Sequence, residues 1–218
     1  ADMPFEVQKE LAPITLVSMT PTAVTLHPSV PATTLKELLA YARTNPGKLN
    51  YASGNTSSIV IAALLFAQAG VKLTHVPYKS EPPAIVDLIS GQVQVMVTSY
   101  SPAAGHLRDG RLRPLALALA QRSPLLPNVP TVVESIPGYD RPPGWMAYLG
   151  PAGMPAPIAR RLHADIVKGM NTTEVQSVFD KLGLLVETSA SPEQFAVEIK
   201  KQLELSGRIV KIAGIEPE

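Results

Sequence analysis

The chain has 218 residues, enough for one large domain or two small ones. Its 19 lysine and arginine residues nearly balance 18 aspartate and glutamate residues, so the net charge of +1 offers no basic excess for a nucleic-acid partner. The absence of cysteine excludes disulfides, thiolate metal sites and a cysteine nucleophile, and it is compatible with an oxidising compartment. No apolar run reaches the ~18 residues needed to cross a bilayer.

Strand and helix patterns alternate along most of the chain. Short apolar runs between turn residues predict strands at 11–17, 24–27, 49–51, 73–78, 92–98, 113–120, 145–149 and 184–187. Capping residues and prolines predict helices at 35–43, 59–70, 84–90, 100–109, 155–170, 173–183 and 192–212. Because strand and helix alternate at least three times between residues 49 and 120, the pattern favours a parallel, doubly wound sheet.

The central stretch of the chain is a strand, a small polar loop and a helix, at residues 48–70. The loop from Ser53 to Ser58 contains hydroxyl residues and one glycine, without charge or bulk. The helix that follows is apolar nearly all round, which predicts that it is buried. Small hydroxyl residues at a helix N-terminus are typical of an anion site. The alternative is that Asn55 or Thr56 serves only as an N-cap.

Three loops follow predicted strands and share one chemistry. Ligands of open α/β sheets lie beyond the carboxyl ends of the strands, and the loops there are 53–58, 78–80 and 98–101. All are rich in hydroxyls and backbone donors, and Lys79 is the one charge they add. This combination suits an oxyanion held by neutral donors. The candidate ligand-binding residues are Ser53, Gly54, Asn55, Thr56, Ser57, Tyr78, Ser99, Tyr100 and Ser101.

Neither a metal site nor a catalytic centre is indicated. The four histidines, at 27, 75, 106 and 163, are scattered and lack metal-ligand spacing with another histidine or an acid. The candidate loops carry neither Gly-x-Ser-x-Gly nor Ser-x-x-Lys, and no base is expected to face Ser53. We therefore expect no catalytic residue, no metal and no cofactor.

Several segments together resemble the Bug/TctC family of periplasmic solute-binding proteins, which serve tripartite tricarboxylate transporters. The segments that carry the resemblance are 4–17, 34–38, 45–49, 51–53, 76–79, 87–93, 122–123, 127–134, Trp145 and 151–153. They span essentially the whole chain in the family's order. The chain departs from the family's usual residues at Gly54-Asn55, Ser80 and Ser135-Ile136, so the resemblance does not name the ligand.

The resemblance implies a two-lobed α/β fold of the type II-like periplasmic-binding-protein class, with doubly wound sheets closing on a carboxylate. Residues 1–26 and 143–218 would form the first lobe, and 27–142 the ligand-binding second lobe. The family's further N-terminal residues carry a Gly-rich carboxylate loop and have no counterpart in this sequence, so the first lobe is expected to be incomplete. The second lobe's carboxylate loop matches residues 53–57.

The implied function is capture of a small organic carboxylate, such as a di- or tricarboxylate, an amino acid or an aromatic acid. The partners would be membrane permease subunits, and the location would be the periplasm after removal of a leader that this sequence does not show. The complete protein is expected to be a monomer, whereas a chain with an incomplete first lobe is expected to self-associate.

Two other functional classes use related chemistry or a related fold. A cytoplasmic transcription regulator can carry an effector-binding module with a similar two-lobe fold, but the sequence shows no helix-turn-helix. An enzyme acting on an acyl substrate would need a nucleophile and a base, which the sequence does not indicate. The interpretation as a receptor is therefore preferred, without enzymatic activity.

Overall fold

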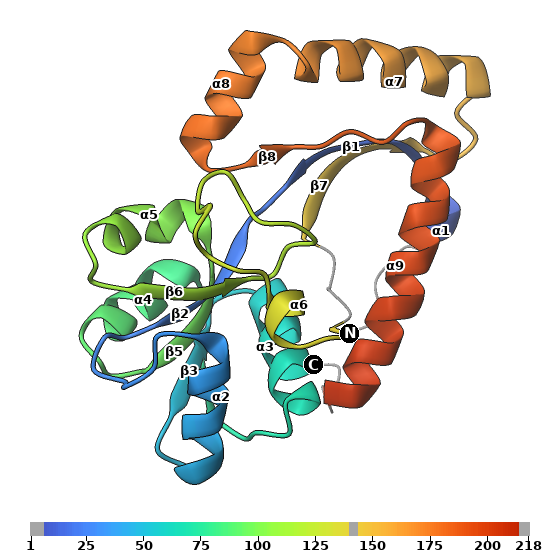
Figure 1. Ribbon diagram of the computed structural model, residues 1–218. Coiled ribbons are helices and arrows are strands. Elements are labelled where there is room, and N and C mark those ends of the chain that lie inside the picture. Colours follow the sequence, from blue (N-terminus) through green and yellow to red (C-terminus); the bar gives the residue numbers. More distant parts are fainter. Residues whose placement is uncertain (1–6, 140–143, 214–218) are drawn as a thin grey trace. The chain divides into compact units, whose positions relative to one another are not determined.

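The computed structural model describes residues 7–139 and 144–213 (Figure 1). The described chain divides into unit 1, with residues 7–20 and 144–208, and unit 2, with residues 21–139 and 209–213. The strands are β1 Leu11–Met19, β2 Thr22–Leu26, β3 Asn50–Ser53, β4 Thr74–Pro77, β5 Val95–Ser99, β6 Arg113–Leu117, β7 Trp145–Pro151 and β8 Leu185–Val186. The helices are α1 Val7–Glu10, α2 Leu35–Thr44, α3 Thr56–Gln68, α4 Glu81–Ile89, α5 Tyr100–Arg108, α6 Val132–Ser135, α7 Ala156–Met170, α8 Thr173–Leu182 and α9 Pro192–Ala213.

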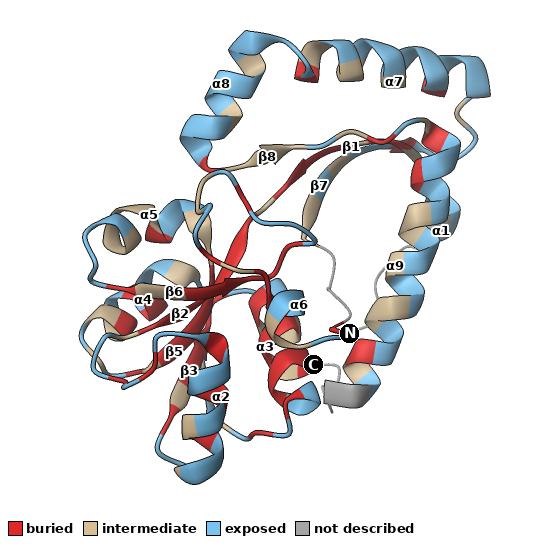
Figure 2. Ribbon diagram, viewed as in Figure 1, coloured by how far each residue is buried: buried red, intermediate tan, exposed pale blue. Residues whose placement is uncertain are grey.

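Unit 2 is built on a five-stranded sheet in the order β4-β3-β5-β2-β6. Strand β3 is parallel to β4 and to β5, whereas β2 is antiparallel to both of its neighbours. The residues of β2, β3, β5 and β6 are largely buried (Figure 2), as expected for apolar runs covered on both faces. The three parallel strands therefore end at the same edge of the sheet.

Helices cover both faces of this sheet. On one face, Ala52 and Met96 of the strands pack with Leu88 of α4 in an apolar cluster. On the other, the ring of Tyr51 in β3 contacts Phe66 of α3 edge to face, with centroids 5.1 Å apart. The expected burial of the apolar helix is confirmed, because its side chains facing the sheet are shielded from water; these include Ile61, Leu64 and Leu65.

Unit 1 contains a three-stranded antiparallel sheet in the order β7-β1-β8. Strands β1 and β7 pair from Leu11↔Pro151 to Met19↔Trp145, with two register shifts. The Trp145 ring packs edge to face on Phe195 of α9, with centroids 5.5 Å apart. Residues of β1, β7 and α9 also line a mostly apolar hollow of about 400 Å³.

Large exposed apolar side chains are concentrated in unit 1. Within the described residues, unit 2 exposes Val86 and Val133, and α7 and α8 of unit 1 are largely exposed (Figure 2). The exposed apolar residues of unit 1 are Met146, Tyr148, Leu149, Ile158, Leu162, Val178, Leu182, Val197 and Leu203. Of the helices that the structure describes, none combines the length and the apolar character needed to pass through a bilayer.

The α/β class is confirmed, but two expectations about its organisation need correction. The first lobe was expected to extend to residue 26, whereas β2 pairs with β5 and β6 and so belongs to unit 2. The expected common direction holds for β3, β4, β5 and β6 of residues 49–120, because β2 is antiparallel to both β5 and β6, but it does not hold for β2 or for unit 1. No helix separates β1 from β2, so the alternation rule that predicts parallel pairing does not apply there.

Element boundaries differ mainly at helix starts. Helix α3 begins at Thr56 rather than at residue 59, and α4 begins at Glu81 rather than at residue 84. Pro82 and Pro83 fit the first turn of α4, because the first amides of a helix have no intrahelical acceptor. This earlier start places the Glu81 side chain in the loop region at the carboxyl edge of the sheet.

Candidate functional site

The carboxyl edge of the parallel strands carries the N-termini of three helices. Strands β3, β4 and β5 end at Ser53, Pro77 and Ser99, and they lead into α3, α4 and α5 respectively. The N-cap residues of these helices are Asn55, Ser80 and Ser99. Unpaired amides and the positive ends of three helix dipoles are therefore presented along one edge of unit 2.

The N-terminus of α3 is closed by a capping box. Asn55 Oδ1 accepts from the Ser58 amide at 2.8 Å, and Ser58 Oγ accepts from the Asn55 amide at 3.2 Å and the Gly54 amide at 3.3 Å. Asn55 is thus the N-cap of α3, and a ligand contact by this residue stays a prediction. By helix geometry, the amides of Thr56 and Ser57 keep no intrahelical acceptor, and both side chains are exposed. The outward-facing donors of this loop are therefore the groups of Thr56 and Ser57.

A carboxylate from α4 joins the loops. Glu81 Oε1 accepts from Asn55 Nδ2 at 3.0 Å, from the Ser99 amide at 3.0 Å and from Ser99 Oγ at 3.2 Å. These contacts bring the start of α3, the start of α4 and the end of β5 together. The sequence analysis missed Glu81, although an acidic residue directly after the 78–80 loop was the available signal.

Gly54 permits the close approach of these loops. A β-carbon at position 54 would lie 2.5 Å from the Glu81 nitrogen and 2.6 Å from Glu81 Cα and from the Ser80 carbonyl carbon. Side chains do not tolerate such distances to backbone atoms, so glycine is required here by space. Gly54 thus permits the close spacing between the β3–α3 loop and α4.

Ser53 faces a histidine, contrary to the sequence expectation. Its Oγ lies 2.6 Å from His75 Nε2, and the His75 ring stacks on Tyr51 with centroids 4.6 Å apart. The contact arises because β3 and β4 are parallel neighbours with Tyr51 opposite His75. Burial lowers the pKa of His75, which favours the neutral ring. Ser53 is only 1% exposed, so its hydroxyl is not in reach of a substrate, whereas His75 is partly exposed.

Tyr78 is directed at α4. Its hydroxyl donates to Asp87 Oδ2 at 2.6 Å, and its ring packs against the apolar cluster of Ala52 and Leu88. Burial and the neighbouring Asp87 carboxylate raise the pKa of Tyr78 to about 12. The side chain therefore stabilises the attachment of α4, and a ligand contact by Tyr78 stays a prediction.

Some donors of the loop after β5 are already used in internal hydrogen bonds. Ser99 gives both its amide and its hydroxyl to Glu81, and the Tyr100 amide donates to the Pro21 carbonyl at 2.8 Å. Ser101 is exposed at the first turn of α5. Of the three residues expected to contact a ligand here, Ser101 presents its hydroxyl outward, and Ser99 is already occupied by an internal acceptor.

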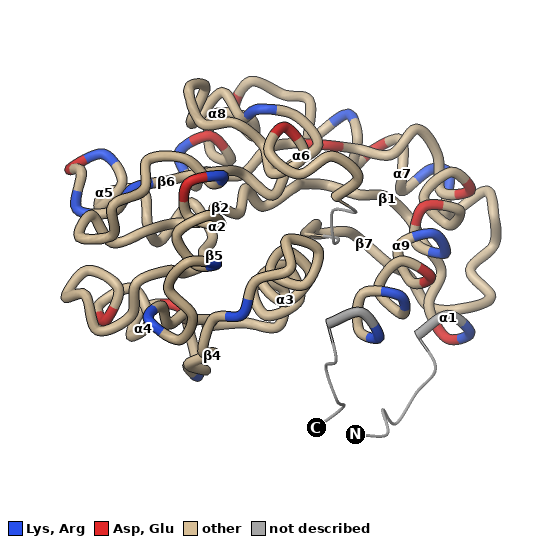
Figure 3. The backbone as a smooth tube through the Cα atoms, turned by 60° about the horizontal axis from the view of Figure 1, so that its bottom comes forward, with Lys and Arg blue, Asp and Glu red and all other residues tan. Residues whose placement is uncertain are grey.

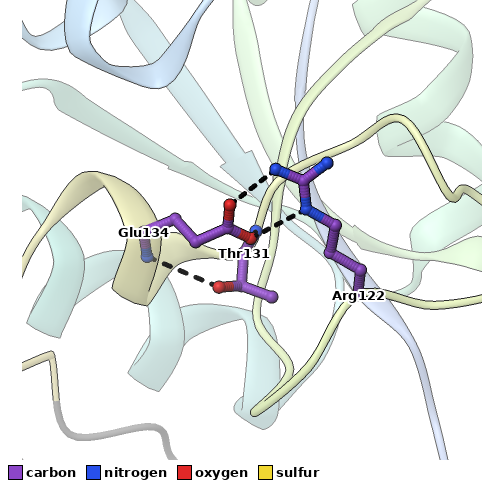
Figure 4. A network of polar contacts seen from close by, with 3 residues as sticks. All are labelled: Arg122, Thr131 and Glu134. Atoms are coloured by element: carbon purple, nitrogen blue, oxygen red, sulfur yellow. Dashed lines mark hydrogen bonds and ion pairs between the residues drawn. The ribbon is translucent and has the colours of Figure 1, made fainter.

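A second polar network in unit 2 lies between residues 122 and 134 (Figure 4). Arg122 donates to Glu134 Oε1 at 3.0 Å and to Glu134 Oε2 at 2.6 Å, while Glu134 also accepts from the Thr131 amide at 2.9 Å. Hydrogen bonds from Arg122 and Thr131 lower the pKa of Glu134 to about 2. These contacts are exposed or partly exposed, and they fix the start of α6 through its N-cap Thr131.

The described part of the chain shows no cluster of metal-ligating residues, and acidic and basic residues are mixed on its helices α7 and α9. No group of three or more histidine or acidic residues there could hold a metal ion. Acidic and basic positions are mixed along α7 and α9 (Figure 3). The candidate site is therefore a set of neutral donors with the Glu81 carboxylate among them and the exposed Lys79 in the adjoining 78–80 loop.

Comparison with known proteins identifies the family. The family description "Tripartite tricarboxylate transporter family receptor", TctC, matches residues 1–215. A UPF0065 protein from the tcbD–tcbE intergenic region of Pseudomonas sp. (strain P51) is 32% identical over 93% of this chain and 61% of its own length. Protein BugT of Bordetella pertussis is 26% identical over 97% of this chain and 65% of its own length. The chain thus spans less than two thirds of the length of these relatives.

Solved structures share the fold. A protein of R. palustris with adipate is 25% identical, with a TM-score of 0.85 over 100% of this chain and 73% of that one. The periplasmic binding protein BugD is 28% identical, with a TM-score of 0.78 over 95% and 71% of the two chains. MatC from Rhodopseudomonas palustris, with bound malate, is 26% identical, with a TM-score of 0.76 over 98% and 73%. The chain therefore belongs to the TctC family of tripartite tricarboxylate transporter receptors.

Proposed function

We propose that this chain is a solute-binding receptor that captures a small organic carboxylate in the periplasm and delivers it to the permease subunits of a tripartite tricarboxylate transporter. The family match supports the receptor role. The adipate and malate in two structural neighbours support the carboxylate class. The compartment and the permease partner rest on the family as a whole.

The convergence of three helix N-termini at the carboxyl edge of β4, β3 and β5 carries the proposal. Neutral amides and hydroxyls bind an anion without the cost of an additional buried charge, and the helix dipoles favour negative charge at this position. The exposed donors of Thr56 and Ser57 lie at the start of α3, which the sequence resemblance assigns to the carboxylate loop.

The expected ligand-binding residues divide into two groups. Thr56, Ser57 and Ser101 are exposed and would donate directly to a carboxylate. The remaining residues either shape the loop or carry internal contacts that a ligand would share or displace; they are Ser53, Gly54, Asn55, Tyr78, Ser99 and Tyr100.

The Ser53–His75 pair does not support an enzymatic alternative. A serine hydrolase needs its nucleophile exposed to the acyl carbon and its histidine oriented by a third group. Ser53 is 1% exposed, and no hydrogen bond found in the described part of the chain engages His75 Nδ1. The bound acid is therefore expected to be released unchanged, and sustained product formation by the purified protein would contradict the proposal.

Calorimetry with mono-, di- and tricarboxylates tests the proposal. Replacing Thr56 by valine keeps the side-chain shape and removes the hydroxyl. A hydrogen bond to a charged group contributes about 1.5–3 kcal/mol, so T56V is expected to weaken binding by roughly 10- to 150-fold. Thr173 is the first residue of α8, as Thr56 is of α3, and it is likewise exposed. T173V is therefore the matched control and should bind like the unsubstituted chain.

Two results would contradict the proposal. If no carboxylate binds, this chain is not a carboxylate receptor. Unchanged affinity in T56V, with every carboxylate that binds, would show that the α3 N-terminus is a cap and that the ligand lies elsewhere.

A further inference from the structure

A histidine of the edge strand β4 holds the last residue of β3, three positions before the exposed donors of α3 begin. Ser53 Oγ lies 2.6 Å from His75 Nε2, and the Tyr78 amide donates to the Ser53 carbonyl at 2.9 Å. Ser53 is buried, so water does not replace the histidine as a partner of the hydroxyl. The end of β3 is therefore tied to β4 and to the loop after it by two hydrogen bonds, one from a side chain and one from the main chain.

The ring of His75 is itself fixed in place. It stacks on Tyr51 with centroids 4.6 Å apart and planes inclined by 15°, and Tyr51 packs edge to face on Phe66 of α3. The strands β3 and β4 and the helix α3 contain no aspartate, glutamate, lysine or arginine. Burial lowers the pKa of His75 below its usual 6.5, so the ring is neutral near pH ~7. A neutral imidazole has one donor and one acceptor nitrogen, so it pairs with a hydroxyl in either tautomer.

A short and restrained segment joins the Ser53–His75 pair to the start of α3. The amides of Gly54 and Asn55, which follow Ser53, both donate to Ser58 Oγ, at 3.3 and 3.2 Å. The next residue, Thr56, is the first of α3. Because Gly54 also packs against the α4 backbone without space for a β-carbon, the segment has little freedom to absorb a movement of Ser53. A shift at Ser53 is therefore expected to move the first turn of α3.

We propose that His75 is a positioning residue of the candidate site. Through Ser53 it fixes the start of the β3–α3 loop, and it thereby sets the affinity for a carboxylate that His75 itself does not contact. The inference rests on the proposed function and assigns part of the binding affinity to a contact within the sheet rather than to the exposed loops. A purely structural role would change the stability alone, whereas a positioning role changes the affinity and the loop amides together.

Calorimetry with malate and adipate on three variants tests the inference. H75F keeps a ring that stacks on Tyr51 and removes both nitrogens, whereas H75Q keeps a donor and an acceptor. S53A removes the other partner and leaves the histidine in place. H75F and S53A should each weaken binding about fivefold or more, as expected for the loss of one hydrogen bond. The double variant should be no weaker than the weaker single one, because both changes remove the same contact. H75Q should bind within about twofold of the unsubstituted chain.

H27F is the matched control. His27 also pairs with a serine of unit 2, since its Nδ1 lies 2.7 Å from Ser29 Oγ. It follows β2, which runs antiparallel to β5, so this pair lies at the opposite edge of the sheet from the candidate site. H27F should therefore leave the affinity unchanged. If H75Q binds as weakly as H75F, the ring acts through its packing alone and the inference is overturned.

Nuclear magnetic resonance of the protein without added acid gives a second, independent measurement. The amide resonances of Thr56 and Ser57 should shift in H75F and S53A and return in H75Q, while the amide of Ser101 in α5 should stay in place. Unshifted Thr56 and Ser57 amides in both H75F and S53A would overturn the inference. If neither malate nor adipate nor any other carboxylate binds, the proposed function is refuted, and these resonances still decide whether His75 positions the loop.

Discussion

Replacing Gly54 by alanine gives a direct test of how the three helix N-termini are held together. The new methyl group would lie 2.5 Å from the Glu81 nitrogen and 2.6 Å from two further backbone atoms. All three atoms are main chain, so no side-chain rotation relieves the contact. Either the β3–α3 loop or the first turn of α4 must move by roughly 1 Å, since ordinary contacts begin near 3.5 Å.

The expected cost follows from overpacking in a well-packed region, about 1–3 kcal/mol. The main chain must move where Asn55 and Ser99 donate to Glu81, at 3.0–3.2 Å, so these hydrogen bonds are expected to lengthen as well. Because the carboxylate site is built from the same loops, G54A should also lose ligand affinity. Chemical denaturation followed by circular dichroism measures the stability, and calorimetry measures the binding.

Gly105 supplies the control for this substitution. It lies within α5, and a β-carbon there would meet nothing within 4 Å. Alanine in a helix interior is favoured over glycine by about 0.5–1 kcal/mol, so G105A should be neutral or stabilising. If G54A unfolds at the same denaturant concentration as G105A, Gly54 does not pack against the α4 backbone in solution. The arrangement of the three helix N-termini described above would then be wrong.

Two further predictions concern the second polar network and the surface of unit 1. The pKa of Glu134 is lowered to about 2 from its usual 4.5, so its contribution to stability is present above pH ~4.5 and is lost as the pH falls toward 2. E134Q should flatten this part of the acid-unfolding profile. An unchanged profile in E134Q would contradict the contact between Glu134 and Arg122. The exposed apolar residues of unit 1 predict concentration-dependent self-association in sedimentation; replacing Met146 and Tyr148 by lysine should reduce it, and a monodisperse unsubstituted chain would refute the prediction.

Local patterns predicted much of the architecture of unit 2. The apolar helix after residue 55, the capping box of Thr34 and Glu37, and the alternation of strands and helices all appear as expected. These features depend on residues within a few positions of one another, which a sequence displays directly. The antiparallel placement of β2 could not be predicted in this way, because its partners in β5 and β6 lie about 70 to 90 positions further along the chain.

Local patterns also fail to predict which side chains meet in the candidate site. Ser53 and His75 meet because β3 and β4 are neighbours in a particular register, and the sequence separation of 22 residues gives no sign of it. Glu81 reaches Asn55 across 26 positions and Ser99 across 18. Each of these contacts depends on the order of strands in the sheet rather than on any local motif.

The placement of Glu81 has a consequence for how ligand specificity is set at such a site. The helix N-termini and their small polar residues supply donors that accept almost any carboxylate, because amides and hydroxyls recognise an oxyanion without regard to the rest of the molecule. Discrimination must then come from a group that penalises some ligands. Glu81 stands at the first position of α4, where the helix dipole favours an acid, and its carboxylate also holds the Asn55 and Ser99 donors. A substitution at residue 81 therefore changes the charge among the donors and the contacts that join the loops at the same time.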